Sequence, residues 1–478
     1  MLGERQRVWR IGTVIAMTVA AIWTSSTARA DDPDRIRPYE AHPQYWQYKG
    51  KPVLLLGGSD DDNLFQWEQD KLAAQLDLLV SAGGNYVRNT MSCRDEGNVF
   101  PFARTADGRF DLDRWDDAYW RRLHRLLTLA YERGVIVQIE LWDPHDYYRD
   151  IGELGGWSRQ PFRPANNINY TLAESGLIDV VDWSAVHDPE KDHPFFQSAP
   201  AERDLALVRQ YQERLVAKVL EVAISFPNVL YCVSNESNDV LAWSDYWAAF
   251  LRREANARGG RIEVGEMRFP RTPHHDDIRH LIARADLYDF LDISQMNRPA
   301  RQEHWDHLMY LRRALADRPR PLNNTKIYGS DEVAWTGGYR TGEECFWRDV
   351  LGGCASARFH RPTSGRGLDP QAQRHIRSAR LLTDAMNVFA CAPRDDLLSE
   401  RSPNEAYCLA EPGKRYAVYF PDGGEVKLDV SGISGRLQVR WLDIARSVWQ
   451  ESQQIQGGAT LDLKSPANGH WAALVLAR

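Results

Sequence analysis

The sequence predicts an α/β fold, a (β/α)8 barrel (TIM barrel) followed by a small antiparallel β-sandwich. Eight short β-rich runs alternate with longer amphipathic stretches between residues 52 and 390, which predicts parallel strands closed into a barrel. The first run is followed by acidic residues at 60–62, where a doubly wound open sheet favours a glycine-rich phosphate loop. Beyond residue 395 the helical periodicity stops and short alternating strands begin.

The eight predicted barrel strands are apolar or alternating runs. They cover residues 52–59, 86–92, 135–143, 229–238, 262–268, 291–297, 322–329 and 354–362. Segments with apolar residues at helical spacing separate them, among them 68–84, 114–134, 202–226, 243–260 and 303–318, and the last long helix covers 371–390. The long third connection, 142–201, is rich in Pro, Asn and aromatic residues and predicts a lid or pocket wall.

The C-terminal strands are separated by strong turn signals. Runs at 416–420, 425–432, 437–443, 459–465 and 470–478 are divided by PDGG, SGISG, QGG and PANG. We therefore expect a barrel domain over residues 31–395 and a β-sandwich domain over residues 396–478. Bracing of the barrel is the simpler role for the sandwich, because its strands carry no obvious row of exposed aromatic residues.

The first 30 residues are typical of an export signal. Arg5, Arg7 and Arg10 precede the 13-residue apolar run 11–23, and Ala28-Arg29-Ala30 offers a small-residue cleavage site. The run is shorter than the roughly 20 residues of a membrane span. We expect a mature chain that begins near Asp31, lies in the periplasm or outside the cell, and has no membrane partner after cleavage.

Composition and motifs exclude several classes of function. The chain has 478 residues, of which 43% are hydrophobic, so it can bury a large core. A net charge of -7 gives no electrostatic basis for binding nucleic acid or an anionic membrane. No Gly-x-Ser-x-Gly elbow or Walker-type loop occurs, which excludes the usual esterase and nucleotide sites. We predict no cofactor, and no feature specifies an oligomeric state.

The cysteines and one histidine cluster do not follow a metal-binding pattern. None of the six cysteines forms a CxxC pair, so we expect no metal centre. Export permits disulfides, and two pairs are candidates, Cys345 with Cys354 and Cys391 with Cys408. In the run 274–277, His-His-Asp-Asp, adjacent residues do not share a helix face, and the Asp pair suits the positive end of a helix dipole.

The fourth predicted strand ends on an Asn-Glu pair, Asn235 and Glu236. Active sites of (β/α)8 barrels lie at the C-terminal ends of the strands, so Glu236 is expected at the mouth of the barrel. Helix capping accounts for Ser237 to Asp239, but not for a carboxylate that directly follows a buried strand. Glu236 is therefore the first candidate catalytic residue.

Cleavage of a glycosidic bond usually requires a second carboxylate. The seventh strand is followed by Asp331 and Glu332, and strands four and seven face each other across a ring of eight. In a retaining enzyme the two carboxyl groups are about 5–5.5 Å apart. Glu332 is the candidate partner of Glu236.

Polar and aromatic side chains at the other strand ends suit recognition of sugar hydroxyls and sugar faces. The candidate substrate-binding residues are Asp60, Arg88, Asn235, Trp142, Asp143, His145, Asn297, Trp335 and His360. A carbohydrate is the expected partner.

Together these features resemble clan A of the glycoside hydrolases. The resemblance is carried by Asn235-Glu236, the acid after strand seven, Arg88 on strand two, Trp142 at the end of strand three, and the trailing sandwich. More specifically, the segments HPQYWQYKGKPVLLLGGS, FWRDVLGGCASARFHRP and YAVYFPDGGEVKLDVSG resemble secreted barrels of the apiosidase-like kind, whose tail is often labelled a collagen-binding domain. The resemblance spans nearly the whole mature chain.

This resemblance implies roles for the carboxylates. Glu236 takes the acid/base role, and a glutamate on the seventh strand takes the role of nucleophile. Family nucleophiles stand near the position of Thr325 and Lys326, so Glu332 comes several residues later than the pattern requires. Asp331, or one of the carboxylates Glu140, Asp143 and Glu266, is the alternative. The expected function is a secreted retaining glycoside hydrolase, and the alternative is a non-catalytic carbohydrate-binding protein on a degenerate barrel.

Overall fold

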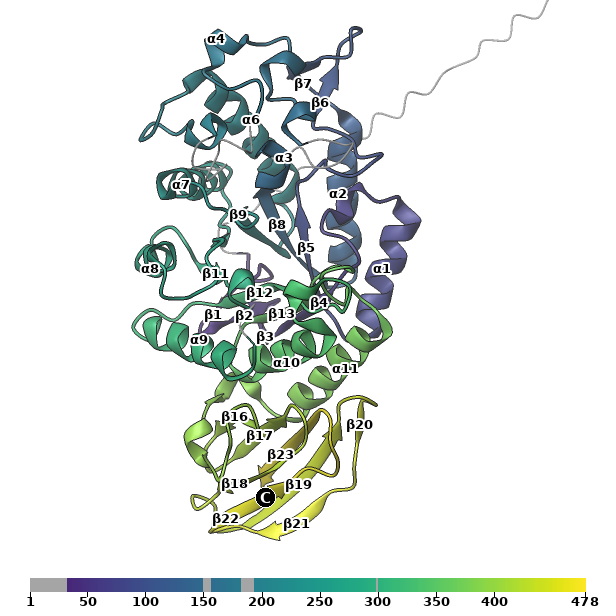
Figure 1. Ribbon diagram of the computed structural model, residues 1–478, viewed down its shortest axis with the longest axis vertical. Helices are drawn as coiled ribbons and strands as arrows, with labels where there is room; N and C mark the ends of the chain where they lie inside the picture. The colour runs from purple at the N-terminus through teal and green to yellow at the C-terminus, as the bar shows by residue number, and fades with distance from the viewer. Residues whose placement is uncertain (1–31, 149–155, 182–192, 298–299) are drawn as a thin grey trace, which may run out of the picture.

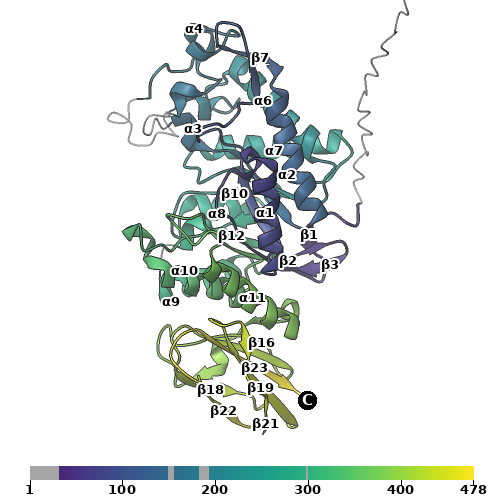
Figure 2. The ribbon, with the colours of Figure 1, turned by 90° about the vertical axis from the view of Figure 1, so that its right-hand side faces the viewer.

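A computed structural model describes residues 32–148, 156–181, 193–297 and 300–478. The expected export signal, residues 1–30, lies outside the described residues. Among the residues that are described, no helix has the length and apolar character needed to cross a membrane. Figures 1 and 2 show the barrel with its helices above a β-domain at one end of the molecule.

Eight parallel strands form a closed barrel, as the sequence predicts. In chain order they are β4 (Leu55–Gly58), β5 (Tyr86–Thr90), β8 (Ile136–Trp142), β9 (Val229–Ser234), β10 (Val264–Met267), β11 (Phe290–Asp292), β12 (Leu322–Ile327) and β13 (Ser356–Phe359). β13 pairs in register with β4 and closes the ring. Every residue of these strands is buried, because helices cover the outside and side chains fill the inside.

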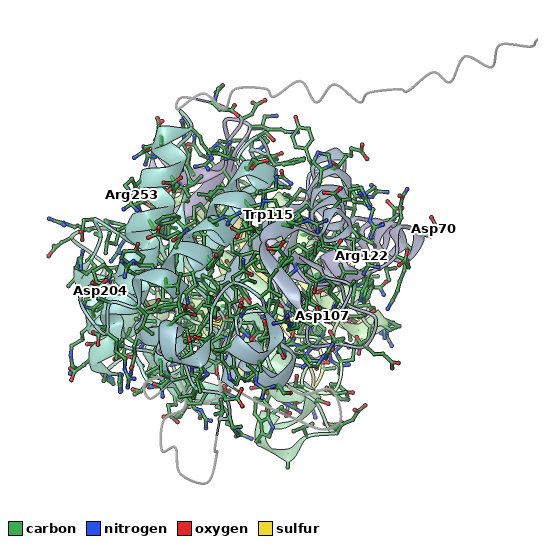
Figure 3. All side chains as sticks on the ribbon, turned by 90° about the horizontal axis from the view of Figure 1, so that it is seen from above. Asp70, Asp107, Trp115, Arg122, Asp204 and Arg253 are labelled. Carbon is green, nitrogen blue, oxygen red and sulfur yellow. The ribbon has the colours of Figure 1, made fainter. Side chains whose placement is uncertain are left out.

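Helices between the strands form the outer layer. They are α1 (Gln69–Ser81), α2 (Asp117–Glu132), α6 (Ala206–Ala223), α7 (Leu241–Ala257), α8 (Asp276–Ala283), α9 (Arg301–Ala314), α10 (Gly338–Leu351) and α11 (Pro370–Ala385). Their apolar faces lie inward, and charged side chains such as Asp70 and Arg253 project from the outer surface (Figure 3). The ring of His275 caps α8 by accepting the amide hydrogen of Asp277, so a capping role accounts for this histidine.

A small antiparallel sheet closes the N-terminal end of the barrel. It consists of β1 (Arg37–Tyr39), β2 (His42–Tyr48) and β3 (Lys51–Val53), and the sequence analysis does not predict it. Trp46 of β2 is fully buried and packs in one cluster with the first residues of several barrel strands. Its indole N–H donates to Asn323 Oδ1 at 2.9 Å. This plug leaves the opposite end as the mouth of the barrel.

The long connection after β8 contains short helices, and its first part packs against the barrel helices. The described elements are α3 (Pro144–Tyr148), η2 (Trp157–Arg159), η3 (Pro164–Asn166), α4 (Leu172–Ser175) and η4 (Pro194–Gln197). Beside them lies a hairpin of β6 (Phe102–Arg104) and β7 (Phe110–Trp115). Phe162, Phe195 and Tyr147 form an aromatic cluster within this region.

The C-terminal domain is antiparallel, in agreement with the predicted β-sandwich. One sheet has the order β14-β16-β17-β23-β19-β20, with β21 paired to β19, and the other has the order β15-β18-β22. The strands are β14 (Ala392–Pro393), β15 (Leu398–Ser399), β16 (Tyr407–Glu411), β17 (Arg415–Phe420), β18 (Glu425–Asp429), β19 (Arg436–Asp443), β20 (Val448–Trp449), β21 (Gln453–Gln456), β22 (Thr460–Lys464) and β23 (Trp471–Ala477). Alternate residues of the sheets form a separate apolar core between them.

The sandwich packs on the barrel through α10 and α11. The rings of Trp347 and Tyr419 stack across the junction, with centroids 5.4 Å apart. Glu343 is nearly buried there and contacts the imidazoles of His470 and His375 at 3.2 and 3.5 Å. Such a mix of aromatic packing and buried charge fixes the two domains against each other.

Candidate active site

Glu236 lies in a strained turn directly after β9. Its φ of 56° falls in the left-handed region that residues other than glycine seldom adopt. Both neighbours are held by adjacent strands: the Asn235 amide donates to the Trp142 carbonyl at 2.8 Å, and the Ser237 amide donates to the Met267 carbonyl at 2.9 Å. Such strain persists only where the surroundings enforce it, and it concentrates at functional sites.

The Glu236 carboxylate faces polar groups from the opposite side of the mouth. Its side chain is 15% exposed. Its Oε1 accepts hydrogen bonds from Lys326 Nζ and, at 3.0 Å, from the Tyr328 hydroxyl. His145 Nε2 lies 4.0 Å from its Oε2. The carboxylate therefore combines partial exposure with ligands from strands three, four and seven.

The charge of Lys326 controls the ionisation of Glu236. Burial opposes ionisation of this carboxyl, but the adjacent Lys326 ammonium outweighs it and holds the pKa of Glu236 well below its usual range. Burial in turn lowers the pKa of Lys326, and the Glu236 carboxylate counteracts part of that shift. The two groups form a buried ion pair, so Glu236 is ionised in the free protein.

A register irregularity in β12 accompanies the inward course of Lys326. The pairing of β12 with β13 is regular at Asn323 and Asn324 and shifts before Ile327. Asn324 reaches outward to Asp349 of α10, whereas Lys326, two residues on, reaches into the mouth. Strict alternation would place both side chains on the same face. A bulge of this kind commonly re-aims side chains beside active sites.

Arg88 of β5 organises the floor of the mouth. Its fully buried guanidinium donates two hydrogen bonds to Glu140 and one to Asp62 Oδ1 at 2.7 Å. It also donates to Asn235 Oδ1 at 3.1 Å, and Asn235 Oδ1 accepts from Lys326 as well. These bonds orient Asn235 and, through it, the turn that carries Glu236.

Asp143 and Arg94 continue this network toward the third strand. Asp143 Oδ1 accepts from Asn235 Nδ2 at 2.9 Å, and its Oδ2 accepts from Arg94 at 2.9 Å. Burial opposes ionisation of Asp143, but Arg94 outweighs it and lowers the pKa of this carboxyl. Arg94 also pairs with Asp62, at 2.9 Å. Asp143 is therefore held ionised but has only 1% of its side chain exposed.

Glu332 and Asp331 lie in the loop that follows β12. Both residues are exposed. The Glu332 amide donates to Ser330 Oγ at 3.1 Å, and Asp331 Oδ1 accepts from the Tyr339 amide at 3.1 Å. The partner that the structure gives Glu236 from strand seven is Lys326. The role of Glu332 as nucleophile stays a prediction.

The other alternative carboxylates are buried and occupied. Glu140 is fully buried and bound by Arg88, and Glu266 is fully buried beneath the Glu236 turn. Glu266 accepts from the Ser234 amide at 3.0 Å and contacts the Ser237 hydroxyl at 2.5 Å. Burial raises the pKa of Glu266 well above its usual range, so this side chain is protonated. It supports the turn rather than meeting a ligand.

The remaining predicted residues divide between the mouth and structural positions. Trp335 is 50% exposed, and its ring meets that of Tyr328 edge-on with centroids 5.0 Å apart. Tyr328 contacts His360 at the same distance, and His360 Nδ1 lies 3.5 Å from Asp62 Oδ1. Trp335 therefore offers an open aromatic face beside Glu236, while His360, at 5% exposure, lies behind it.

Two predicted contacts differ in the structure. Trp142 is fully buried among Tyr147, Phe195, Trp243 and Trp247, so its ring cannot stack on a sugar, and that expectation is wrong. Asp60 is exposed but anchors the backbone by accepting from the Leu368 amide at 2.8 Å. Its neighbour Asp62 enters the mouth network instead. Asn297 ends η5 (Ser294–Asn297), and the placement of its side chain is not described.

Several mouth residues were not selected from the sequence. Tyr328 follows the seventh strand directly, and its position offered the same signal that identified Glu236. Arg94 lies in a loop four residues after β5, without a local pattern that marks it. Lys326 was noticed only as a non-acidic residue, and its pairing with Glu236 requires the irregular register of β12.

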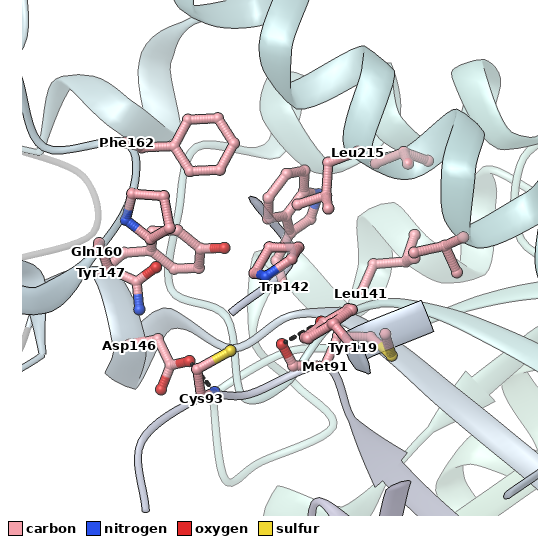
Figure 4. Close-up of a pocket in the computed structure, with 14 residues that line it drawn as sticks. Met91, Cys93, Tyr119, Leu141, Trp142, Asp146, Tyr147, Gln160, Phe162 and Leu215 are labelled. Atoms are coloured by element: carbon pink, nitrogen blue, oxygen red, sulfur yellow. Dashed lines mark hydrogen bonds between the residues drawn. The ribbon is translucent and has the colours of Figure 1, made fainter. Parts of the chain in front are cut away.

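A pocket beside the third strand is too small for a sugar (Figure 4). It is lined by Trp142, Tyr147, Phe162 and residues of α6, and its free volume of about 10 Å³ holds about one water molecule. Asp146 lies at its edge and accepts from the Cys93 amide at 2.8 Å. A glycan is therefore expected at the polar mouth around Glu236 rather than in this cavity.

Comparisons with known proteins identify the fold. No protein-family model and no curated relative matches the sequence. A glycoside hydrolase family 5 structure from Bacteroides vulgatus superimposes with a TM-score of 0.63 at 12% identity, over 94% of this chain and 95% of that chain. A second structure, named glycoside hydrolase, gives a TM-score of 0.63 at 11% identity over 94% of this chain and 98% of that one. The chain thus has the barrel and appended β-domain of glycoside hydrolase structures.

Proposed function

We propose that this protein is a glycoside hydrolase that acts on a polysaccharide or oligosaccharide at the barrel mouth. The observation that carries the proposal is the position of Glu236: a partly exposed carboxylate, in a strained turn, at the C-terminal end of the fourth strand. The arginines, histidines and carboxylates around it match the paired donors and acceptors of sugar hydroxyls. The likeness of the whole chain to glycoside hydrolase structures supports the same class of activity.

In this proposal Glu236 is the acid/base. It protonates the leaving oxygen of the glycosidic bond and later removes a proton from water. Because Lys326 keeps Glu236 ionised in the free protein, a bound glycan must weaken this ion pair before Glu236 can carry the proton. The hydroxyl of Tyr328 holds Oε1 in place during the exchange.

A retaining reaction also needs a nucleophile, and we propose Glu332 for this role. The loop that carries it is exposed and joins the end of β12 to α10. The proposal requires this loop to bring the Glu332 carboxyl to about 5–5.5 Å from Glu236 when a glycan is bound. The neighbouring Trp335 gives the glycan an aromatic surface in the same loop.

A second candidate function is glycan binding without hydrolysis. It is favoured by Lys326, which pairs with Glu236 from the strand that supplies the nucleophile in the resembled clan. An ammonium group in that place neutralises Glu236 and cannot attack the anomeric carbon as a carboxylate does. The two functions share the same ligand site and differ in whether a bond is broken.

We further propose that the protein acts outside the cytoplasm, after cleavage of the signal near Asp31. Expression of the full chain in a Gram-negative host, followed by fractionation and N-terminal sequencing of the product, tests this. A mature chain that begins near Asp31 in the periplasm or the medium is expected. A cytoplasmic product that retains Met1 would contradict it.

The function itself is tested by incubating the purified mature protein with a panel of polysaccharides and aryl glycosides and measuring released reducing sugar. Binding to the same panel is measured by calorimetry. Release that Glu236→Gln abolishes supports the hydrolase. Binding without release supports the second candidate, and neither binding nor release on any glycan would contradict both.

A further inference from the structure

Four ligand-type side chains meet between the barrel wall and its outer helices, on the side next to the sandwich (Figure 1). His304 lies on α9, Cys345 and Asp349 lie on α10, and Cys354 lies in the turn after α10. Cys345 and Asp349 are four residues apart and therefore share one helix face. All four side chains are at most 1% exposed. None of them belongs to the mouth of the barrel.

The spacing of their ligand atoms is unusual for hydrogen bonds. His304 Nε2 lies 3.6 Å from Cys345 Sγ and 3.4 Å from Asp349 Oδ1. Asp349 Oδ2 lies 3.7 Å from Cys345 Sγ, and Oδ1 lies 3.6 Å from Cys354 Sγ. The nitrogen–oxygen distance exceeds the roughly 2.7–3.2 Å of a good hydrogen bond.

These distances match the edges of a metal tetrahedron. Zinc binds sulfur at about 2.3 Å and nitrogen or oxygen at about 2.0–2.2 Å, which separates neighbouring ligand atoms by roughly 3.3–3.8 Å. Imidazole, thiolate and carboxylate are the ligands that zinc takes in proteins. We propose that His304, Cys345, Asp349 and Cys354 form a structural zinc site.

The backbone and a neighbouring strand already position these ligands. The Cys354 amide donates to the Asp349 carbonyl at 2.9 Å, which fixes the turn that joins them. Asn324 of β12 donates its side-chain N–H to Asp349 Oδ2 at 2.8 Å and leaves Oδ1 directed at His304 and Cys354. Outer groups of this kind orient metal ligands. Zinc at this point would tie α9 and α10 to each other and, through Asn324, to the seventh barrel strand.

The charge around the cluster suits a metal with acidic ligands. Two thiolates and one carboxylate around Zn²⁺ leave a net charge of -1, and the buried guanidinium of Arg348 lies beside the cluster to balance it. Arg348 Nε donates to His304 Nδ1 at 3.3 Å, so without metal the ring hydrogen of His304 is on Nε2. Loading transfers that hydrogen to Nδ1, breaks the Arg348 bond, and releases one proton each from Cys345, Cys354 and Asp349.

The sequence alone predicts no metal, because the four ligands follow no CxxC pattern. They are spread over residues 304–354 and come together only through the packing of α9 on α10. The site offers four protein ligands and no exposed position, which defines a structural rather than a catalytic metal. The same side chains held only by weak hydrogen bonds, without metal, are the competing explanation.

The test uses the full mature chain. Zinc content is measured by plasma mass spectrometry after dialysis, and the metal-stripped protein is reloaded with Co²⁺ and examined by visible absorption. We expect about one zinc per chain, and cobalt bands typical of tetrahedral thiolate coordination. Zinc should raise the melting temperature of the stripped protein. These measurements need no variant, so they stand even if the variants fold poorly.

The variants locate the metal. Cys345→Ser and His304→Gln should lose the zinc and the cobalt charge-transfer band, whereas Cys408→Ser, which changes a buried thiol of the sandwich, should retain both. Thiols are counted in the denatured wild-type protein. Wild-type protein that holds no zinc, shows no tetrahedral cobalt spectrum and gains no stability from zinc would overturn the proposal. A disulfide between Cys345 and Cys354 would overturn it as well; in the structure all six cysteines are free thiols, including both sequence-suggested pairs.

Discussion

Lys326 Nζ at the end of the seventh barrel strand donates to the carboxylate of Glu236 at the end of the fourth. The pair spans the mouth, and its lysine stands where the sequence resemblance implies a carboxylate. Burial disfavours the charges of both groups, and each charge offsets the penalty of the other. This relationship decides the ionisation of Glu236 and therefore dominates the chemistry of the site.

Mutation of one partner of this pair should destabilise the barrel more than mutation of both. Lys326→Met leaves the Glu236 carboxylate without its counter-ion, at a cost of about 2 kcal/mol or more in the free energy of unfolding. The double variant Lys326→Met/Glu236→Gln should recover part of this loss. A double-mutant cycle of urea denaturation measures the coupling, and additive effects would show that the pair is not formed in solution.

The ion pair also predicts a pH dependence. A depressed pKa in the folded state contributes stability above the unfolded pKa of Glu, about 4.5, and that stability is lost as the pH falls through the folded pKa of Glu236. Wild type should therefore exceed Glu236→Gln in melting temperature at pH 7, and the difference should shrink as the pH falls below about 4.5. A difference that does not depend on pH would contradict the shift.

Glu263, outside the mouth, should show the opposite sign. Burial and the neighbouring Asp289 raise the pKa of Glu263 to about 8. Its stabilising contribution is present below the unfolded pKa of about 4.5 and is lost as the pH rises to about 8. Glu263→Gln, which stays neutral, should flatten the fall in melting temperature between pH 5 and pH 8. Identical curves for variant and wild type would refute a raised pKa at this position.

Trp335 should contribute to glycan affinity but little to stability. Its ring is 50% exposed beside Tyr328, so Trp335→Ala removes an open stacking surface. A stacking contact is worth about 0.5–1.5 kcal/mol, which corresponds to roughly a 2- to 12-fold loss of affinity. Calorimetric titration with a glycan ligand measures it, and Trp449→Ala in the sandwich serves as a control. Unchanged affinity would remove Trp335 from the binding site.

Glu266→Gln should be close to neutral in stability and activity. The carboxyl is already protonated beneath the Glu236 turn, and glutamine keeps its shape and its acceptor for the Ser234 amide. Glu266→Ala, in contrast, leaves Ser237 and the Ser234 amide without this partner and should lower the melting temperature. Loss of activity in the Gln variant with an intact fold would instead give Glu266 a direct role in catalysis.

The fold followed from the sequence because each barrel strand is a short buried run between periodic helices. The same logic placed Glu236 at the mouth, since it directly follows β9. The N-terminal sheet was missed because its short strands lack a clear alternation, and Trp46 is fixed only by long-range packing. Trp142 was misread because its place at a strand end suggested exposure, whereas residues of the long connection and α7 cover it.

The course of the seventh strand marks the limit of the sequence argument for the site. Alternation along residues 322–327 predicts that Lys326 shares a face with Asn324, and the irregular register of β12 places the two in different surroundings. Local sequence carries no signal for this bulge. The zinc ligands are likewise distant in sequence and become neighbours only through helix packing.

The most direct test of the central claim compares wild type, Glu236→Gln and Glu332→Gln in the glycan panel, with sugar release and glycan binding measured on the same samples. The account predicts release by wild type, a loss of at least about 1,000-fold in rate for each variant, and retained binding. If Glu332→Gln remains active, the nucleophile lies elsewhere. Binding by wild type without any release would contradict the hydrolase and leave a glycan-binding barrel.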